Sequence, residues 1–275
     1  MITFQQRLQA ASERNDSLLC VGLDIEPDMM AERDVLTFCR TIVQATADQV
    51  CAFSAHLAFF ESLGSEGTQV LEQLRDFIPR DVPIIALAYR SDQSLPSSFS
   101  ARAIYDVFGF DAVTVNPYGG LDAVEPFVAY RDKGVFVQCR TNNRDAGELQ
   151  LLPVQRPDGG TAPLYEVVAE RARAWNAYGN VGIVVAPMYP EELQRVRAMC
   201  PDQVILVPDI SPMSGGYDAA VRDGVRADRG GVIVNMARQV LYASRSEDYE
   251  NAARAAAQRL RTRLNAARPA ANRNA

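Results

Sequence analysis

Eight short apolar runs, separated by segments with helical periodicity, are the feature that most constrains the fold of this chain. The runs are almost continuously apolar rather than alternating, as expected of parallel strands covered on both faces. They span residues 17–23, 50–57, 82–88, 111–116, 134–139, 181–186, 204–208 and 231–235. Eight such repeats close most simply into a (β/α)8 TIM barrel, for which 275 residues is an ordinary length. An open doubly wound sheet is the alternative.

We expect a single domain over residues 1–275. Residues 1–15 have the pattern of a short amphipathic helix. Residues 141–163 show little periodicity and follow the fifth predicted strand, which makes this segment a long loop and a candidate lid over the active site. The tail, residues 268–275, is expected to fray.

Composition excludes several classes of function. The net charge is -6 and most of the chain lacks a dense Lys/Arg run, so we expect no nucleic-acid partner. No stretch reaches the ~20 apolar residues of a membrane span and none resembles a secretory signal, so we expect no membrane partner and a cytoplasmic location. One histidine and widely spaced cysteines offer no ligand cluster, so neither a metal nor another cofactor is expected. The five cysteines should be reduced core residues: Cys20, Cys39, Cys51, Cys139 and Cys200.

The loops after the seventh and eighth predicted strands indicate a phosphate site, because parallel barrels commonly hold phosphate there. The first loop contains Ser214, Gly215 and Gly216 before a predicted helix, and their backbone N–H groups can approach an anion. The second contains Arg238, whose guanidinium can donate two parallel hydrogen bonds to phosphate oxygens. Glycine-rich turns without a ligand are the alternative.

Polar residues follow three other predicted strands. Asp24 comes after the first strand, Asp92 after the third, and Asn116 ends the fourth. A carboxylate at such a position can accept hydrogen bonds from sugar hydroxyls, so we expect Asp24 and Asp92 to contact the ligand. Capping of the following helix is the alternative role.

Several longer segments match one known family: CVGLD (20–24), LAFFE (57–61), VTVNPYGG (113–120), EPFVAYRDKGVFVQCRT (125–141), YPEELQRVR (189–197) and LYAS (241–244). From about Leu18 to Ser244 the chain resembles the longer bacterial orotidine 5′-monophosphate decarboxylases. The resemblance implies a TIM barrel, a phosphorylated nucleotide-like ligand and cofactor-free chemistry. It also implies a homodimer in which Asp92 reaches across the interface into the neighbour's site.

The sequence departs from that family at its catalytic positions. The family's lysine after strand two falls on Ser54, and its Asp-x-Lys-x-x-Asp segment falls on Leu87, Tyr89 and Asp92, so only the last aspartate is kept. No shift of register restores the lysines, because only one of the 28 basic residues is a lysine, Lys133. In the phosphate loop the family's glutamine falls on Met213, whereas its arginine is kept as Arg238.

The replacements offer different chemistry. Residues two apart in a strand share a face, so Ser54 and His56 should point to the same side, as should Leu87 and Tyr89. His56, the only histidine, could act as an acid or base near neutral pH, with Tyr89 as proton donor or hydrogen-bond partner and Ser54 orienting it. Alternatively, His56 is a core histidine and Tyr89 fills space.

From these departures we expect that the chain is not a canonical orotidine 5′-phosphate decarboxylase. The first hypothesis is non-canonical lyase, isomerase or hydrolase chemistry on a nucleotide-like phosphate ester in specialised nucleoside metabolism. A catalytically silent nucleotide-binding or self-resistance protein and a decarboxylase of another carboxylated nucleotide are the alternatives. The expected catalytic residues are His56, Tyr89, Asp92 and Ser54, and the expected substrate-binding residues are Asp24, Asn116, Arg140, Met213, Ser214, Gly215 and Arg238.

Overall fold

A closed barrel of parallel strands forms the centre of the molecule in a computed structural model that describes residues 2–156, 159–209 and 216–270. The barrel strands are β1 (Leu19–Gly22), β2 (Ala52–His56), β3 (Ile84–Arg90), β4 (Ala112–Val115), β5 (Gly134–Arg140), β8 (Val181–Val185), β9 (Ile205–Val207) and β10 (Val232–Met236). Their order around the barrel is β1-β10-β9-β8-β5-β4-β3-β2, and β1 pairs with β2 to close it. The predicted TIM barrel is confirmed, and each of the eight apolar runs overlaps one strand.

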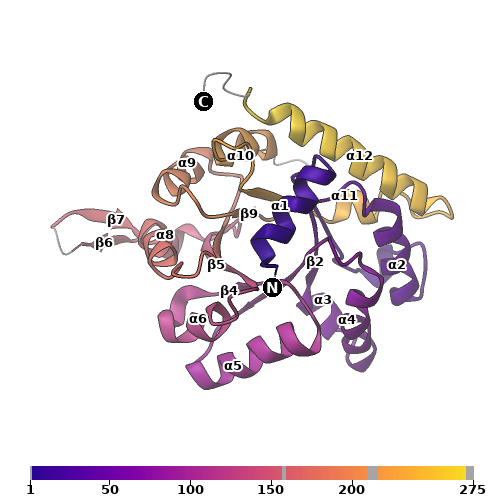
Figure 1. Ribbon diagram of the computed structural model, residues 1–275, viewed down its shortest axis with the longest axis horizontal. Helices are drawn as coiled ribbons and strands as arrows, with labels where there is room; N and C mark the ends of the chain where they lie inside the picture. The colour runs from indigo at the N-terminus through magenta and orange to yellow at the C-terminus, as the bar shows by residue number, and fades with distance from the viewer. Residues whose placement is uncertain (1, 157–158, 210–215, 271–275) are drawn as a thin grey trace.

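Helices surround the barrel and cover the outer faces of its strands (Figure 1). The outer helices are α2 (Val35–Thr46), α4 (Ser65–Phe77), α5 (Ser94–Arg102), α6 (Leu121–Val128), α8 (Leu164–Ala174), α9 (Pro190–Met199), α10 (Tyr217–Gly224) and α12 (Tyr249–Ala267). Shorter helices are α3 (Leu57–Glu61), α7 (Gly147–Gln150) and α11 (Arg238–Leu241). None of the helices in the described ranges is long and apolar enough to cross a membrane.

The segment predicted as a long loop, residues 141–163, contains secondary structure of its own. It holds α7 and an antiparallel pair, β6 (Pro153–Gln155) with β7 (Thr161–Pro163). This hairpin projects outward beside α8, away from the barrel (Figure 1). On the turn side of the hairpin, Arg156 bonds to Glu170 of α8 at 2.6 Å.

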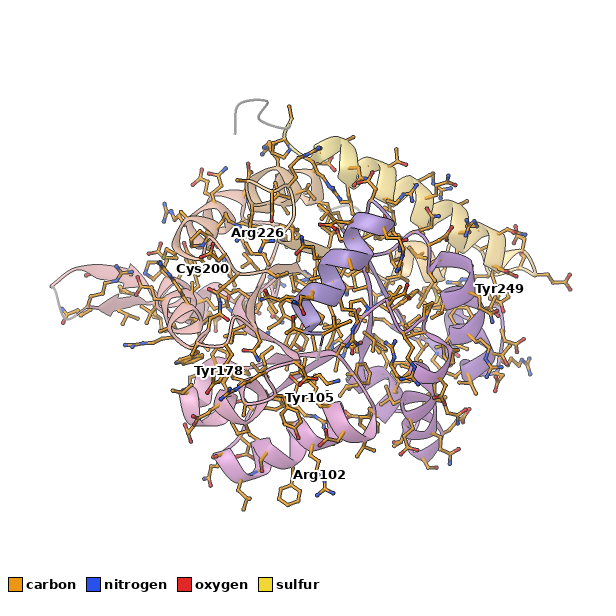
Figure 2. The ribbon with its side chains drawn as sticks, viewed as in Figure 1. Arg102, Tyr105, Tyr178, Cys200, Arg226 and Tyr249 are labelled. Atoms are coloured by element: carbon orange, nitrogen blue, oxygen red, sulfur yellow. The ribbon has the colours of Figure 1, made fainter. Side chains whose placement is uncertain are left out.

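The lumen of the barrel is filled by apolar side chains rather than open. Strand residues that point inward form one buried cluster with two residues of the first helix, α1 (Phe4–Arg14). The cluster consists of Phe4, Leu8, Cys20, Cys51, Ala52, Ile85, Leu87, Ala112, Phe136, Val184, Val204, Leu206 and Ile233. Figure 2 shows side chains filling the space between the strands. The packed lumen separates the two ends of the barrel from each other.

Helix α1 closes the end of the barrel at which the strands begin. Thr3 caps the helix in a reciprocal capping box with Gln6, and Phe4 packs edge-on against Phe136 at a centroid distance of 5.8 Å. Gly134 is required beneath this contact, because a Cβ at that position would lie 2.4 Å from the Phe4 ring. The end where the strands finish is not covered by α1.

A buried carboxylate ties this closing helix to the barrel. Asp111, just before β4, is 2% exposed and accepts hydrogen bonds from Arg7 of α1, from Arg75 Nη1 of α4 at 3.1 Å and from the backbone N–H of Ile84 at 3.0 Å. One side chain therefore connects α1, α4 and β3.

Replacing Asp111 with alanine should lower the free energy of unfolding by about 3–5 kcal/mol, because two arginines and a backbone N–H would lose their acceptor in a buried place. Urea denaturation measures this change. Asp81→Ala is the matched control, since Asp81 pairs with Arg14 of the same helix on the surface and should cost less than ~1 kcal/mol. Equal losses in the two variants would contradict the role assigned to Asp111.

Candidate functional site

A pocket of about 430 Å³ lies at the C-terminal ends of the barrel strands. Ligand sites of parallel barrels lie at this end because the loops that follow the strands converge there. The lining residues are Asp24, His56, Leu87, Tyr89, Gln138, Thr141, Asn142, Asn143, Val184, Pro208, Asp209 and Asn235. Of the residues predicted from sequence, the structure brings Asp24, His56 and Tyr89 together here.

Asp24 is a carboxyl group held in a poorly solvated and acidic environment. Its Oδ1 accepts a hydrogen bond from the backbone N–H of His56 at 3.3 Å. Burial raises the pKa of Asp24 to about 7, helped by the nearby charge of Asp209 and opposed by the His56 hydrogen bond and by Arg238. At neutral pH this group is therefore present both as an acid and as a carboxylate.

Ser54 lies beneath the pocket rather than in its wall. Its side chain is fully buried, and its hydroxyl is 2.9 Å from Oδ1 of Asn235, which does line the pocket. Gly22 makes room for this pair, since a Cβ there would lie 3.2 Å from the Asn235 oxygen and 3.3 Å from the Ser54 hydroxyl. The position that carries lysine in the resembled family thus supports the floor of this pocket.

His56, Leu87 and Tyr89 form an aromatic and apolar wall. The His56 ring lies 5.8 Å from the Tyr89 ring and 5.5 Å from the Phe59 ring, and its Nδ1 is buried without a hydrogen-bond partner among the described residues. Burial lowers the pKa of His56 below its usual value, with Glu61 opposing that shift. The unpaired nitrogen leaves a hydrogen-bonding position for a ligand.

The direction of the Tyr89 side chain depends on an irregularity in β3. The regular alternation of side chains along a strand does not predict this irregularity. The pairing of β3 with β4 shifts register between Ala86 and Arg90, and Tyr89 has a φ of +48°, which is uncommon for a residue with a side chain. Thr114 Oγ1 accepts from the backbone N–H groups of Ala88 and Tyr89 at 3.0 and 3.1 Å, which satisfies both donors at the bulge. Burial raises the pKa of Tyr89 to about 12, so its hydroxyl keeps its proton at neutral pH.

Asp92 and Asn116 lie in a neighbouring pocket rather than with His56. That second pocket also contains Tyr118 and is connected to the first by Tyr89, which lines both. Asn116 accepts a hydrogen bond from the Tyr118 backbone N–H at 3.0 Å and caps a short 3-10 helix, which is the alternative considered for it. Asp92 is exposed and accepts from the backbone N–H of Gln93 at 2.7 Å.

Arg238 is the described part of the predicted phosphate site. It begins α11 directly after β10, its side chain is 63% exposed, and its Nε donates to Glu26 at 2.8 Å. Met213, Ser214 and Gly215 lie outside the described residues. The charge of Arg238 also reaches Asp24, whose pKa it lowers, so this arginine faces the pocket's acidic side.

Arg140 does not line the pocket. Its side chain is 2% exposed, bonds to Glu192, donates to Gln150 at 3.0 Å and stacks 3.9 Å from the Tyr189 ring. These contacts hold the start of the 141–163 segment against α9. They also occupy the guanidinium of Arg140, which is therefore not offered to a ligand in the pocket.

Asp209 was not anticipated from the sequence and is central to the pocket. Its carboxylate accepts from the Tyr217 hydroxyl at 2.9 Å and from the Ala237 backbone N–H at 3.0 Å. It follows β9 in the same way that Asp24 follows β1, so an acidic residue directly after an apolar run was the available signal. Gln138, Thr141 and Asn142 were also missed.

Lys133 lies at the opposite end of the barrel from this pocket. It precedes β5, and its Nζ donates to the Phe110 carbonyl at 2.9 Å and lies 3.9 Å from Asp111. The single lysine of the chain therefore takes no part in the pocket.

Comparisons with known proteins agree on one family. Residues 98–256 match the family described as orotidine 5′-phosphate decarboxylase / HUMPS. A protein of Thermomicrobium roseum named orotidine 5′-phosphate decarboxylase is 43% identical, over 94% of this chain and 94% of its own length. A protein of Roseiflexus castenholzii with the same name is 42% identical, over 97% and 98%. The solved structure of Leishmania donovani OMP decarboxylase has a TM-score of 0.84 at 36% identity, and the match covers 97% of this chain and 98% of that one.

The prediction of non-canonical chemistry is wrong, together with its alternatives of a silent binding protein and of a decarboxylase for another nucleotide. Relatives about 42% identical over nearly the whole chain are named orotidine 5′-phosphate decarboxylase, which points to the canonical enzyme. The prediction gave decisive weight to a few side chains.

Replacing Asp24 with asparagine should stabilise the protein at pH 8 and change its stability little at pH 4. An unfolded aspartate loses its proton near pH 4, whereas the folded Asp24 loses it at about pH 7. Wild-type stability therefore falls as the pH rises from about 4 to about 7, and stays reduced above that range. Asparagine lacks this penalty, so urea denaturation at pH 8 should show a gain of about 1–3 kcal/mol.

Asp92→Asn is the control for this measurement, because Asp92 is exposed. Its stability should follow that of the wild type at both pH values. If Asp24→Asn and Asp92→Asn had the same dependence on pH, the buried, proton-retaining state of Asp24 would be excluded.

Proposed function

Since the chain belongs to the orotidine 5′-phosphate decarboxylase / HUMPS family, we propose that it converts orotidine 5′-phosphate into uridine 5′-phosphate and carbon dioxide. The observation that carries this proposal is the similarity of nearly the whole chain to relatives that bear the name of that activity. The reaction takes place in the pocket lined by Asp24, His56 and Tyr89.

The arrangement of charges gives the substrate one orientation. Arg238, exposed at the rim, binds the phosphate through the guanidinium nitrogens that Glu26 does not use. Asp24 and Asp209 accept hydrogen bonds from the ribose hydroxyls, and Asn235 lines the same pocket. The base then occupies the wall formed by Leu87 and Tyr89.

The chemical step needs a place for a charge and a source for a proton. Breaking the bond between C6 and the carboxylate releases carbon dioxide and leaves an electron pair on C6, which a proton donor must neutralise. Leu87 is 4% exposed and offers the substrate carboxylate no hydrogen bond. The charged carboxylate is therefore poorly stabilised in the bound substrate, which favours its departure as neutral carbon dioxide.

Three catalytic positions of the family carry Ser54, Leu87 and Tyr89 here, so the proton does not come from a lysine. We assign it to His56 in its imidazolium form, with Tyr89 as a neighbouring hydrogen-bond donor. Ser54 acts through Asn235 as a positioning residue.

His56→Gln should lower kcat for orotidine 5′-phosphate decarboxylation by at least ~100-fold, the usual contribution of a positioned acid. Release of carbon dioxide and formation of uridine 5′-phosphate are measured together. Because burial lowers the pKa of His56, the imidazolium form is lost at a lower pH than for an ordinary histidine, so the kcat of the wild type should fall with rising pH and the fall should begin below the usual histidine range. That decline should be absent in the variant.

Tyr178→Phe serves as the control, because Tyr178 is exposed and packs against Arg131 outside the pocket (Figure 2). It should retain wild-type kcat, whereas Tyr89→Phe should lower it. Recovery of unchanged orotidine 5′-phosphate after incubation with excess folded wild-type protein would refute the proposed activity.

We further propose that the active form is a homodimer with Asp92 near the interface, reaching toward the neighbour's pocket. An exposed apolar surface next to Asp92 supports it, formed by α5, α6 and the turn before α6. Its large side chains are Leu95, Phe99, Tyr118 and Leu121. Phe99 is 64% and Tyr118 89% exposed in the single chain, which is costly for aromatic side chains in water.

Sedimentation velocity should show a dimer for the wild type and a monomer for Phe99→Asp, because a buried charge would oppose association at this surface. Leu149→Asp is the matched control, since Leu149 is 61% exposed but lies on α7. A monomeric wild type, or equal dissociation of both variants, would count against this interface.

A further inference from the structure

A second cavity, of about 380 Å³, lies at the opposite end of the barrel from the candidate site. Its walls come from α1, from the loop between α10 and β10, and from the end of α12, and its apolar floor is formed by Leu18, Cys51, Val204 and Val232. Figure 1 shows α1 and α12 bordering this end of the barrel, and Figure 2 labels Arg226 on the loop before β10. The volume is within the range of small-molecule sites.

Two arginines in this cavity have buried N–H groups without acceptors among the described residues. They are Nε of Arg229 and both Nε and Nη2 of Arg268. The remaining contact of Arg268 is a long one, from Nη1 to Asp16 at 3.4 Å. Buried guanidinium donors without acceptors are costly, so their presence indicates that an acceptor belongs in the cavity.

The two guanidinium groups also repel each other. Burial lowers the pKa of Arg268, the negative charge of Asp16 opposes that shift, and the positive charge of Arg229 adds to it. Two like charges kept close in a poorly solvated place need a counter-charge between them.

The acidic residues of the cavity supply this counter-charge only in part, because they lie at the rim and also bond to other groups; Asp16 is the one that pairs with Arg268, at 3.4 Å. Asp228 accepts from Arg226 Nη2 and from the Gly230 backbone N–H, both at 2.9 Å. Asp16, whose side chain is 76% exposed, accepts from Asn265 at 3.0 Å. Glu13 is exposed and accepts from Gln9 at 2.8 Å.

The backbone holds Arg229 in an uncommon conformation that sets the direction of its side chain. Its φ is +63°, in the left-handed region, and the turn is closed by hydrogen bonds from the Arg229 N–H to the Arg226 carbonyl and from the Arg226 N–H to the Gly230 carbonyl, both of 2.9 Å. Such a conformation is unfavourable for a residue with a side chain. In the described residues it occurs otherwise at Tyr89, in the candidate site, and at Asp16, in this same cavity.

We propose that this cavity is a second ligand site, which binds the phosphate group of a small phosphorylated compound between Arg229 and Arg268. A phosphate offers several acceptor oxygens and about two negative charges, and so can accept from both guanidinium groups at once. Gln5, Gln9 and Ser12 of α1 form the polar wall on one side of the cavity. None of these residues lines the candidate site, so this proposal does not rest on the decarboxylase activity.

The test uses the full-length Arg238→Gln protein, in which the phosphate position of the first pocket is weakened. Isothermal titration at constant ionic strength is carried out with inorganic phosphate, pyrophosphate and uridine 5′-phosphate. We expect one bound equivalent per chain. Adding Arg229→Asn or Arg268→Gln should weaken this binding at least tenfold, and asparagine suits the left-handed conformation at position 229. Tighter binding of the nucleotide than of inorganic phosphate would identify a phosphate ester as the ligand, and the reverse order would identify inorganic phosphate.

Arg263→Gln, added to the same Arg238→Gln protein, is the matched control. Arg263 lies on α12 near Arg268 in sequence but pairs with Asp218 on the surface at 2.9 Å, so its loss should leave the affinity unchanged. Absence of binding to the folded Arg238→Gln protein would overturn the proposal. Unchanged binding in both cavity variants would overturn it too, because the bound phosphate would then lie elsewhere. A lost decarboxylase activity would not affect either result.

Discussion

The packing of the barrel lumen is the constraint on which the rest of this structure depends. Inward side chains of the strands, from Cys20 and Ala52 to Ile233, meet Phe4 and Leu8 of α1 in one dry cluster. Burial of this apolar surface stabilises the closed barrel, and its tight packing leaves no channel through the centre. Polar groups are therefore confined to the two ends, where each strand begins or finishes.

The same constraint sets the electrostatics of both ends. A carboxyl group that lies against the packed lumen loses much of its hydration, so the pKa of Asp24 rises to about 7 and the charge of Asp209 adds to the shift. At the other end the loss of hydration acts on a cation, and the pKa of Arg268 falls. Each pocket thus contains groups whose charged state becomes more favourable when a ligand supplies hydrogen bonds or opposite charge.

Only some of the residues predicted from the sequence line the pocket, because the ends of the strands are not regular. His56 reached the pocket by simple continuation of β2, whereas Tyr89 reached it through a bulge and a positive φ. Ser54, two residues before His56 in β2, lies one layer deeper in the barrel, where its hydroxyl donates to Asn235. Arg140 ends β5 but is held by Glu192, a partner more than fifty residues away that no local pattern indicates.

The sequence by itself determined the barrel, because eight apolar runs with intervening helices have few other ways to bury their surfaces. It also predicted the end of the barrel at which the candidate pocket lies, and its matching segments indicated the family. It did not determine the function correctly, since the argument rested on a few substituted side chains and relatives similar over the whole chain indicate otherwise. Only the tertiary structure decided which polar residues share a pocket, placing Asp209 with Asp24 and Arg229 with Arg268. Such pairs lie far apart in the chain, and barrel closure alone brings them together.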